Sequence, residues 1–225
     1  MKTLRMNSLK AIFTIFFMCG IQLQAQDVER NNFNVTADVY SNYIWRGTRF
    51  GKGPHIQPGV KYEKGNFTAG VWGSFDGSGY SETDPYMFYA LPFGLTLGVT
   101  DYYYPGLKLA DISQEGGSHA LEINGTFVKK GFSLNCNYII NEAGGAGSKG
   151  SDVYLQAGYN FDSVSIFAGA GNGWYTEDNS FNLCNIGVGT VKTIQISEKF
   201  SIPLTGQVII NPDKEQLFVV AGFSF

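Results

Sequence analysis

The sequence predicts an all-β protein, a closed antiparallel transmembrane β-barrel of about 12 strands, within a range of about 10 to 14. Its composition suits this fold class, because 29 glycines, 18 phenylalanines and 13 tyrosines accompany only 16% charged residues. After the N-terminal region, no segment has sustained helical periodicity or an apolar run long enough for a membrane helix. Membrane-crossing segments must then be strands, and only a closed barrel satisfies their backbone hydrogen bonds in lipid.

The first 25 residues have the pattern of a secretory signal peptide. A basic region contains Lys2, Arg5 and Lys10, and an apolar stretch follows at Ala11–Leu23. This stretch is shorter than the roughly 20 apolar residues of a transmembrane anchor. Cleavage after Ala25 would leave one barrel domain at residues 26–225. Cys19 leaves a lipoprotein as an alternative, although large residues precede it.

The charge and cysteine content exclude several classes of protein. Without residues 1–25 the chain keeps 13 basic and 19 acidic residues, a formal net charge of −6. An acidic chain argues against a nucleic-acid partner, which needs a basic surface. Cys136 and Cys184 then remain, in no metal-ligand spacing and with no disulfide framework. The sequence predicts neither a metal site nor a cofactor.

Alternating polarity marks the expected strands, beginning with residues 34–46 and 55–63. The clearest segments are Phe67–Phe75, Phe132–Ile140 and Val153–Phe161, where apolar residues alternate mostly with Ser, Thr, Asn, Gln or Gly, and also with Trp72, Ile139 and Tyr154. The last strand, Gln216–Phe225, places its apolar residues at odd positions and is expected to pair with the first strand. Phe223 and Phe225 are the expected signal for the barrel-assembly machinery.

Short and long connections alternate along the chain. The short ones lie at 63–66, 91–94, 129–131, 160–163 and 195–199. The longer ones, rich in Gly, Ser and Asp, lie at 47–54, 76–83, 105–118, 141–151, 171–180 and 211–214. This alternation is typical of short periplasmic turns and longer extracellular loops, and places both termini on the periplasmic side.

If the apolar faces contact lipid, the opposite faces line the lumen. The candidate pore-lining residues are Asp38, Arg46, Gln57, Lys61, Glu63, Trp72, Glu122, Asn135, Asn137, Asp152, Gln156 and Gln207. The six charged members are expected to form a network, since ionisable groups in a membrane protein face water or one another. Such a network either sets the selectivity of a pore or holds a closed interior together. A barrel of about 12 strands lies between filled and open sizes.

The remaining aromatic residues and histidines point to fewer functions. Tyr43, Trp45, Tyr102–Tyr104 and Trp174–Tyr175 are expected in the aromatic girdles at the membrane interface, with stacking on sugar rings as an alternative. His55 and His119 are the only histidines, and no Gly-x-Ser-x-Gly motif is present. The sequence therefore predicts no enzyme, although a lipid-modifying barrel enzyme is the rival class.

The segment Ser41-Asn42-Tyr43-Ile44-Trp45-Arg46-Gly47, followed by Ile56–Gly59 and Gly70–Ser74, resembles the TorF family of porin-like proteins. Tyr102–Pro105 and Glu122 also match, so the likeness covers the N-terminal half. It implies an outer-membrane barrel of a Gram-negative bacterium, proposed as a porin, and brings no catalytic residues.

The resulting expectation is a porin-like channel for passive diffusion of small polar or charged solutes. Its expected partners are outer-membrane lipid, lipopolysaccharide, the assembly machinery and those solutes; the oligomeric state is not predicted. The alternative is a structural or adhesive barrel with a plugged lumen and functional outer loops. A secreted β-sandwich is a further alternative.

Overall fold

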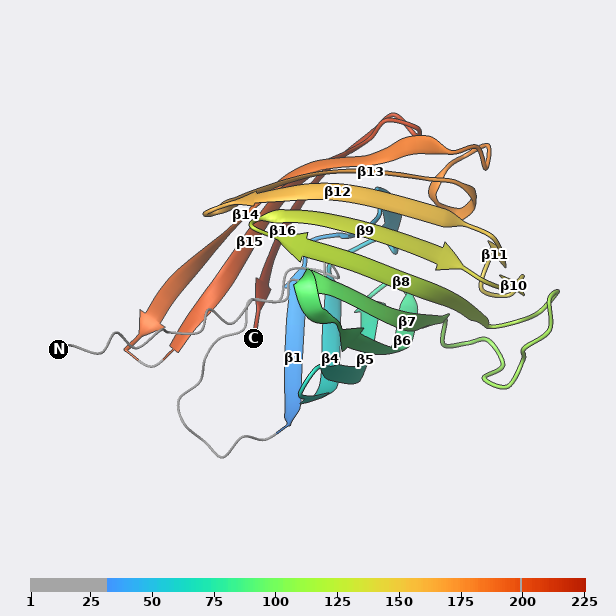
Figure 1. The fold of residues 1–225 in the computed structure, drawn as a ribbon, viewed down its shortest axis with the longest axis horizontal. Coiled ribbons are helices and arrows are strands. Elements are labelled where there is room, and N and C mark those ends of the chain that lie inside the picture. The colour runs from blue at the N-terminus through green and yellow to red at the C-terminus, as the bar shows by residue number, and fades with distance from the viewer. Residues whose placement is uncertain (1–31, 199) are drawn as a thin grey trace.

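A computed structural model of the chain describes residues 32–198 and 200–225, so the expected signal peptide lies outside the described residues. Twelve strands form a closed barrel in the order β1-β16-β15-β14-β13-β12-β9-β8-β7-β6-β5-β4 (Figure 1), and all their pairings are antiparallel. The predicted fold class is confirmed. The barrel strands are β1 (Phe33–Tyr40), β4 (His55–Lys64), β5 (Phe67–Asp76), β6 (Ser81–Ala90), β7 (Leu95–Tyr103), β8 (His119–Lys129), β9 (Phe132–Ile139), β12 (Val153–Phe161), β13 (Val164–Gly171), β14 (Asn182–Ser197), β15 (Phe200–Asn211) and β16 (Gln216–Ser224).

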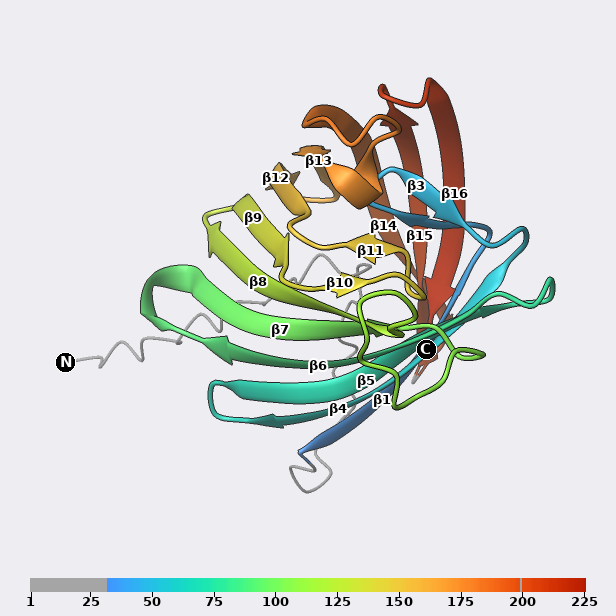
Figure 2. The same ribbon diagram turned by 90° about the vertical axis from the view of Figure 1, so that its right-hand side faces the viewer.

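The connections hold the smaller elements. Two hairpins lie outside the barrel sheet, β2 (Tyr43–Trp45) with β3 (Thr48–Phe50) and β10 (Glu142–Ala143) with β11 (Ser148–Lys149). The short 3₁₀ helices are η1 (Pro92–Gly94) and η2 (Gly173–Tyr175). Both hairpins and η2 belong to the long connections, at the end opposite the short turns (Figures 1 and 2).

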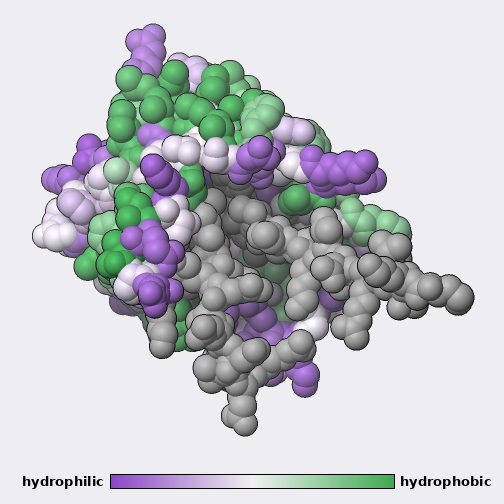
Figure 3. Space-filling view, turned by 90° about the vertical axis from the view of Figure 1, so that its left-hand side faces the viewer, coloured by the Kyte–Doolittle hydropathy of each residue, from purple (hydrophilic) through white to green (hydrophobic). Residues whose placement is uncertain are grey.

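The two faces of the wall differ in polarity in the sense opposite to that of a water-soluble domain. On β9, Phe132 and Leu134 point outward and are 41% and 44% exposed, whereas Asn135 and Asn137 point inward and are 8% and 6% exposed. The same alternation runs through the other strands, and apolar residues cover much of the outside of the wall (Figure 3). An apolar outer face around a polar interior is the arrangement of a transmembrane barrel.

The seam that closes the barrel is short. β1 and β16 share three residue pairs, Asp38 with Ser224, Val39 with Phe223 and Tyr40 with Gly222. Ala37 and Phe225 extend the seam through two backbone hydrogen bonds of 3.0 and 3.3 Å. By contrast, β1 pairs with β4 along its whole length, from Phe33 to Tyr40. Phe223 and Phe225 lie together on the outer face, with ring centroids 5.4 Å apart; their role in assembly stays a prediction.

The first strand ends earlier than the sequence predicts. Tyr40 pairs directly with His55, so the intervening chain leaves the wall and forms β2–β3. Tyr43 and Trp45 were expected in the outer aromatic girdle, but they are buried inside the barrel at 2% and 9% exposure. Tyr102 and Tyr175 are also buried in the interior, which makes the girdle assignment wrong for them as well. Alternating polarity predicts which side chains face lipid or lumen only for residues that belong to a barrel strand.

Within the described residues, none of the helices has the length and apolar character required to cross a membrane.

Neighbouring positions on β15 test which face contacts lipid. Val208 points outward and Gln207 points inward. We expect Val208→Lys to lower the free energy of unfolding in lipid vesicles by about 2–4 kcal/mol, the cost of a lysine near the bilayer midplane. Gln207→Lys should change it by much less, because that side chain faces the polar interior. Urea titrations followed by tryptophan fluorescence would measure both, and equal losses would contradict the assignment of faces.

Candidate functional site

The β2–β3 hairpin, called here the plug hairpin (residues 43–50), has a tight two-residue turn. Arg46 and Gly47 have φ values of +50° and +82°, as a type I′ hairpin turn requires. Gly47 is needed for space as well, since a side chain there would collide with the carbonyl oxygen of Cys184 on the barrel wall. Arg46 has a positive φ without being glycine, a strained conformation that the surrounding contacts must hold in place.

The Arg46 guanidinium holds the hairpin to the opposite wall. It donates hydrogen bonds to both carboxylate oxygens of Glu122, at 2.5 and 2.8 Å, and a third to the hydroxyl of Tyr175 at 2.7 Å. The two side chains are only 10% and 0% exposed. Two parallel N–H···O bonds between arginine and carboxylate are strong and fix the relative orientation of both groups.

Further donors and aromatic rings complete this buried pair. The Tyr102 hydroxyl donates to Glu122 Oε1 at 2.9 Å, and the Asn124 amide donates to the same oxygen. The Arg46 guanidinium carbon lies 4.6 Å from the ring centroids of Trp45 and Tyr154, within the range of cation–π attraction. A buried ion pair is tolerated when its remaining hydrogen-bonding groups are satisfied, as they are here.

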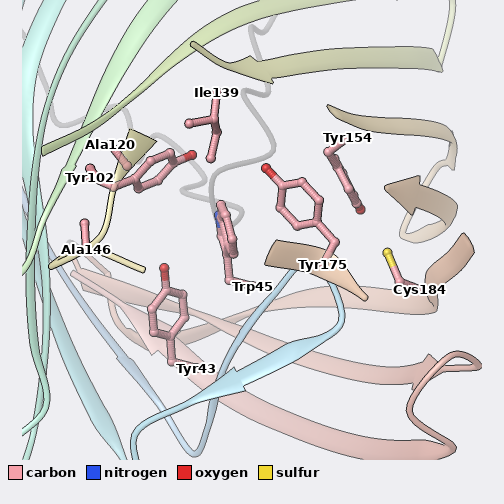
Figure 4. Packing of buried hydrophobic residues seen from close by; sticks show 10 residues of the cluster. Tyr43, Trp45, Tyr102, Ala120, Ile139, Ala146, Tyr154, Tyr175 and Cys184 are labelled. Carbon is pink, nitrogen blue, oxygen red and sulfur yellow. The ribbon is translucent and has the colours of Figure 1, made fainter. Parts of the chain in front are cut away.

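Aromatic packing and polar contacts extend across the outer half of the interior. Trp45 lies between Tyr102 and Tyr175, each ring centroid 5.3 Å away (Figure 4). Tyr43 packs on the other side against Trp72, at 5.6 Å. The turn is also held by the Asn211 amide, which donates to the Gly47 carbonyl at 3.0 Å. The plug hairpin therefore contacts several strands of the barrel, on the side of the long connections.

A cavity of about 110 Å³, called here the lumen cavity, lies on the short-turn side of Arg46. Interior side chains become more exposed in that direction. On β8, Glu122 and Asn124 are buried, whereas Thr126 and Val128 are partly exposed. On β4 the same change occurs between Gln57 and Lys61. The cavity is lined by Tyr43, Ile44, Trp45, Arg46, Trp72, Phe88, Asn124, Thr126, Asn135, Asn137, Tyr154, Gln156, Phe167, Asn185, Gln207 and Ile209.

The candidate pore-lining residues separate into two groups. Half of them line the lumen cavity: Arg46, Trp72, Asn135, Asn137, Gln156 and Gln207. Glu122 adjoins this group through Arg46. The other candidates lie elsewhere, namely Asp38, Gln57, Lys61, Glu63 and Asp152. Whether any of these residues lines an open pore stays a prediction.

The expected single charge network is wrong. Arg46 pairs with Glu122, and Lys61 pairs separately with Glu63 at 3.1 Å near the short-turn end. Among the described residues, Asp38 and Asp152 belong to no ion pair of this set. The Arg46–Glu122 pair depends on how the plug hairpin crosses the lumen, and single-strand alternation contains no information on that.

Several residues of the site were missed because they were assigned to the girdles. Trp45, Tyr102 and Tyr175, which were expected in the girdles, surround the Arg46–Glu122 pair together with Tyr154, which was not named as a site residue. The sequence contains one signal for this site, the Trp45-Arg46-Gly47 triplet. An arginine that enters the barrel interior needs a buried acidic partner, which here is Glu122.

The histidines have structural partners. His55 is fully buried; its Nδ1 lies 2.8 Å from Ser74 Oγ and its Nε2 lies 3.1 Å from the Phe50 carbonyl oxygen. For His119, Asp101 Oδ2 lies 2.8 Å from its Nδ1 and its ring stacks on Tyr103. Neither histidine lines the lumen cavity.

Cys184 offers a built-in reporter for the position of the plug hairpin. It is 0% exposed beneath Gly47. We expect Glu122→Gln, in a Cys136→Ser background, to raise the rate of Cys184 labelling by a soluble thiol reagent at least about tenfold. Breaking a buried pair from one side costs about 3–5 kcal/mol, because the remaining charge is uncompensated. Glu63→Gln is the matched control and should leave the rate unchanged; identical rates in the two variants would contradict the role of Glu122.

Asp152, in the loop before β12, predicts a pH dependence. Burial raises the pKa of its carboxyl from 3.8 to about 6. A folded-state pKa above the unfolded value means that stability is full below the unfolded pKa and falls as pH rises through about 6. Asp152→Asn should therefore gain stability relative to the native chain at pH about 8 and not at pH about 3, measured by urea unfolding.

Asp111 is the matched control, since hydrogen bonds from Ser113 lower the pKa of its exposed carboxyl. Asp111→Asn should lose stability at the higher pH instead. The same sign of change in both variants would contradict these assignments.

The chain is similar to several solved structures and matches the model of one protein family. Solved structures that are similar include two engineered variants of the porin of Rhodopseudomonas blastica and a structure described as an engineered protein with asymmetric conductivity. Each is 13% identical, with a TM-score of 0.40 over 76% of this chain and 55% of the other, so the chain spans about half their length. A likeness this distant carries no argument about function. Comparison with curated proteins found no match. The model of a family described as bacterial protein of unknown function (Gcw_chp) matches residues 26–200, and the chain belongs to this family.

Proposed function

We propose that the mature chain, from Gln26, is an outer-membrane channel of a Gram-negative bacterium for passive diffusion of small polar or charged solutes. In this proposal residues 1–25 are a cleaved signal peptide. The barrel-assembly machinery inserts the barrel, with Phe223 and Phe225 as its signal, and lipid and lipopolysaccharide surround it. The resemblance of residues 41–74 to the TorF family supports this reading. The apolar outer face and polar interior of the wall support it independently.

The Arg46–Glu122 ion pair connects the plug hairpin to the opposite wall across a polar interior, and this observation is the basis of a more specific proposal. The lumen narrows from partly exposed side chains at the short-turn end to the Arg46–Glu122 pair at the outer half. At that level the side chains of the plug hairpin and of the wall are buried against one another. We therefore propose a narrow channel in its closed conformation, which conducts when the plug hairpin moves aside.

The interior charges favour cations over anions. Acidic residues on the interior face outnumber basic ones, since Glu82 and Asp84 on β6 add to Asp38, Glu63 and Glu122. Arg46 and Lys61, basic residues of the described interior face, are both paired with carboxylates. Rings of acidic side chains select cations in pores.

A second candidate function is a structural or adhesive barrel with a permanently plugged lumen. The extent of the plug contacts favours it: Trp45 and Tyr43 pack in a cluster that also includes Ala143 and Ala146 of the 140–152 loop. In that case the outer loops would carry the function. The two candidates differ in whether loosening the plug hairpin creates a conducting path.

Single-channel recording of the refolded barrel in planar bilayers separates them. We expect the native chain to be mostly silent, and the Arg46→Ala/Glu122→Ala double variant to show cation-selective steps with at least about tenfold higher open probability. A loss of about 1.4 kcal/mol from the closed state suffices for that factor, and removing both partners leaves no unpaired buried charge.

Lys61→Ala/Glu63→Ala removes an ion pair outside the plug and is the control, expected to remain silent. A third variant replaces residues 43–50 with a Gly-Ser linker. If this variant forms a heat-modifiable barrel and still never conducts, the channel proposal fails and the plugged barrel is supported.

A further inference from the structure

The wall of the lumen cavity carries a row of side-chain amides. Asn124 on β8, Asn137 on β9, Gln156 on β12, Asn185 on β14 and Gln207 on β15 all point into the same space. Asn135, one step further toward the short turns on β9, joins them. β8, β9 and β12 are consecutive in the barrel, and only β13 separates β12 from β14. The amides therefore form a band on one side of the cavity, interrupted on β13 by Phe167.

Hydrogen bonds use both ends of Asn124, but for the other amides in this band they involve at most one end of the side chain. Asn124 donates to Asn137 Oδ1 at 3.0 Å, Asn185 donates to Gln156 Oε1 at 3.1 Å, and Thr126 donates to Asn135 Oδ1 at 2.9 Å. In the described part of the chain, Asn185 Oδ1 is buried without a hydrogen-bond partner, an arrangement that costs free energy. A band of fixed donors and acceptors is thus presented to whatever occupies the cavity.

Aromatic side chains also line the cavity: Tyr154 and Phe167 lie on the amide side, and others lie opposite. Trp72 on β5 and Phe88 on β6 are across the barrel from the amide band, and Trp45 and Tyr43 cover the cavity from the plug hairpin. Aromatic rings offer flat apolar faces to the C–H groups of a ligand. A site that combines such faces with neutral hydrogen-bonding groups is typical of ligands with both apolar and hydroxyl surfaces.

The lining has no unpaired charge to attract an ion. Arg46 is the charged residue that lines the cavity, and its guanidinium is already hydrogen-bonded to both carboxylate oxygens of Glu122. A charged ligand would lose its hydration without gaining a counter-charge, which is unfavourable. A neutral ligand meets no such penalty.

Size and access limit the ligand further. About 110 Å³ has room for roughly eight to ten waters, at about 10–15 Å³ of this volume for each. That is comparable with one monosaccharide. The plug hairpin covers the outer side, so the cavity is reached from the short-turn end, where interior residues such as Thr126 are partly exposed.

We propose that the lumen cavity binds one small neutral polyhydroxylated molecule of monosaccharide size. Its hydroxyl groups bond to the amide band, and its C–H face packs against the aromatic side. The inference deepens the proposed channel and rests on it for its role in transport, since it names the solute class that pauses beneath the plug hairpin. The binding step itself can be measured without any conduction.

The test titrates the folded native chain in detergent with D-glucose, and in parallel with choline and with glutamate as charged probes. Two of the three tryptophans, Trp45 and Trp72, line the cavity, so intrinsic fluorescence reports occupancy, and calorimetry detects binding that leaves fluorescence unchanged. We expect saturable binding of D-glucose and none of the charged probes. Asn137→Leu/Gln156→Leu should raise the Kd for D-glucose at least about tenfold. Leucine has a volume similar to that of the two amide side chains but makes no hydrogen bonds.

Gln114→Leu, on the exposed 104–118 loop, removes an amide outside the cavity and should leave the Kd unchanged. The inference is overturned if D-glucose gives neither a fluorescence nor a heat signal with folded protein, if the double variant binds as tightly as the native chain, or if choline or glutamate binds more tightly. The channel proposal is judged separately. Conducting plug variants without sugar binding would refute only the sugar site, whereas sugar binding with silent plug variants would refute only the channel.

Discussion

Closure of the sheet is the constraint on which the rest of the structure depends. In lipid each strand must pair on both sides, so β1 has to meet β16 and every wall residue must face either lipid or lumen. The apolar face then lies outside, and the interior receives Asn, Gln, Thr and charged residues. Eight strands enclose a space that wall side chains can fill, and 16 or more leave a channel. With 12 strands the wall alone does not fill the interior, and the plug hairpin occupies the part that remains at the outer end.

The plug hairpin is held by an interaction that arginine suits and lysine does not. The planar guanidinium reaches both oxygens of Glu122 and the Tyr175 hydroxyl at once, while its faces contact Trp45 and Tyr154. An ammonium group would offer a point charge without that geometry. The backbone of Arg46 lies in a conformation that costs about 1–3 kcal/mol. The strained backbone of Arg46 and the ion pair with Glu122 therefore act in opposite directions on the plug hairpin. This balance suits a hairpin that moves between a closed and an open position.

The barrel was predictable from the sequence because alternation with a period of two survives in nearly every wall strand. The same alternation correctly gave the interior direction of Asn135, Asn137, Gln156 and Gln207, since these lie in the middle of paired strands. It failed at Tyr43 and Trp45, because residues that leave the wall keep a strand-like pattern without keeping its faces. It also could not pair Arg46 with Glu122, 76 positions apart, since that contact depends on how a loop crosses the lumen. The amide band arises only when five strands, β8, β9, β12, β14 and β15, are brought around one space.

The short seam between β1 and β16 also forms the base of the plug hairpin. Immediately beyond Tyr40, the Ser41 amide bonds to the Ala221 carbonyl at 2.8 Å, and the Asn42 side chain reaches the Val219 carbonyl at 3.3 Å. The hairpin is therefore anchored on the edge of the line where the sheet has its fewest paired residues. A displacement of the plug hairpin would therefore pull on the β1–β16 seam, and a weakened seam would allow the hairpin to move more easily. Mechanical load on the long connections would then reach the seam through three hydrogen bonds, because the Ala221 amide also donates to Ser41 Oγ at 3.0 Å.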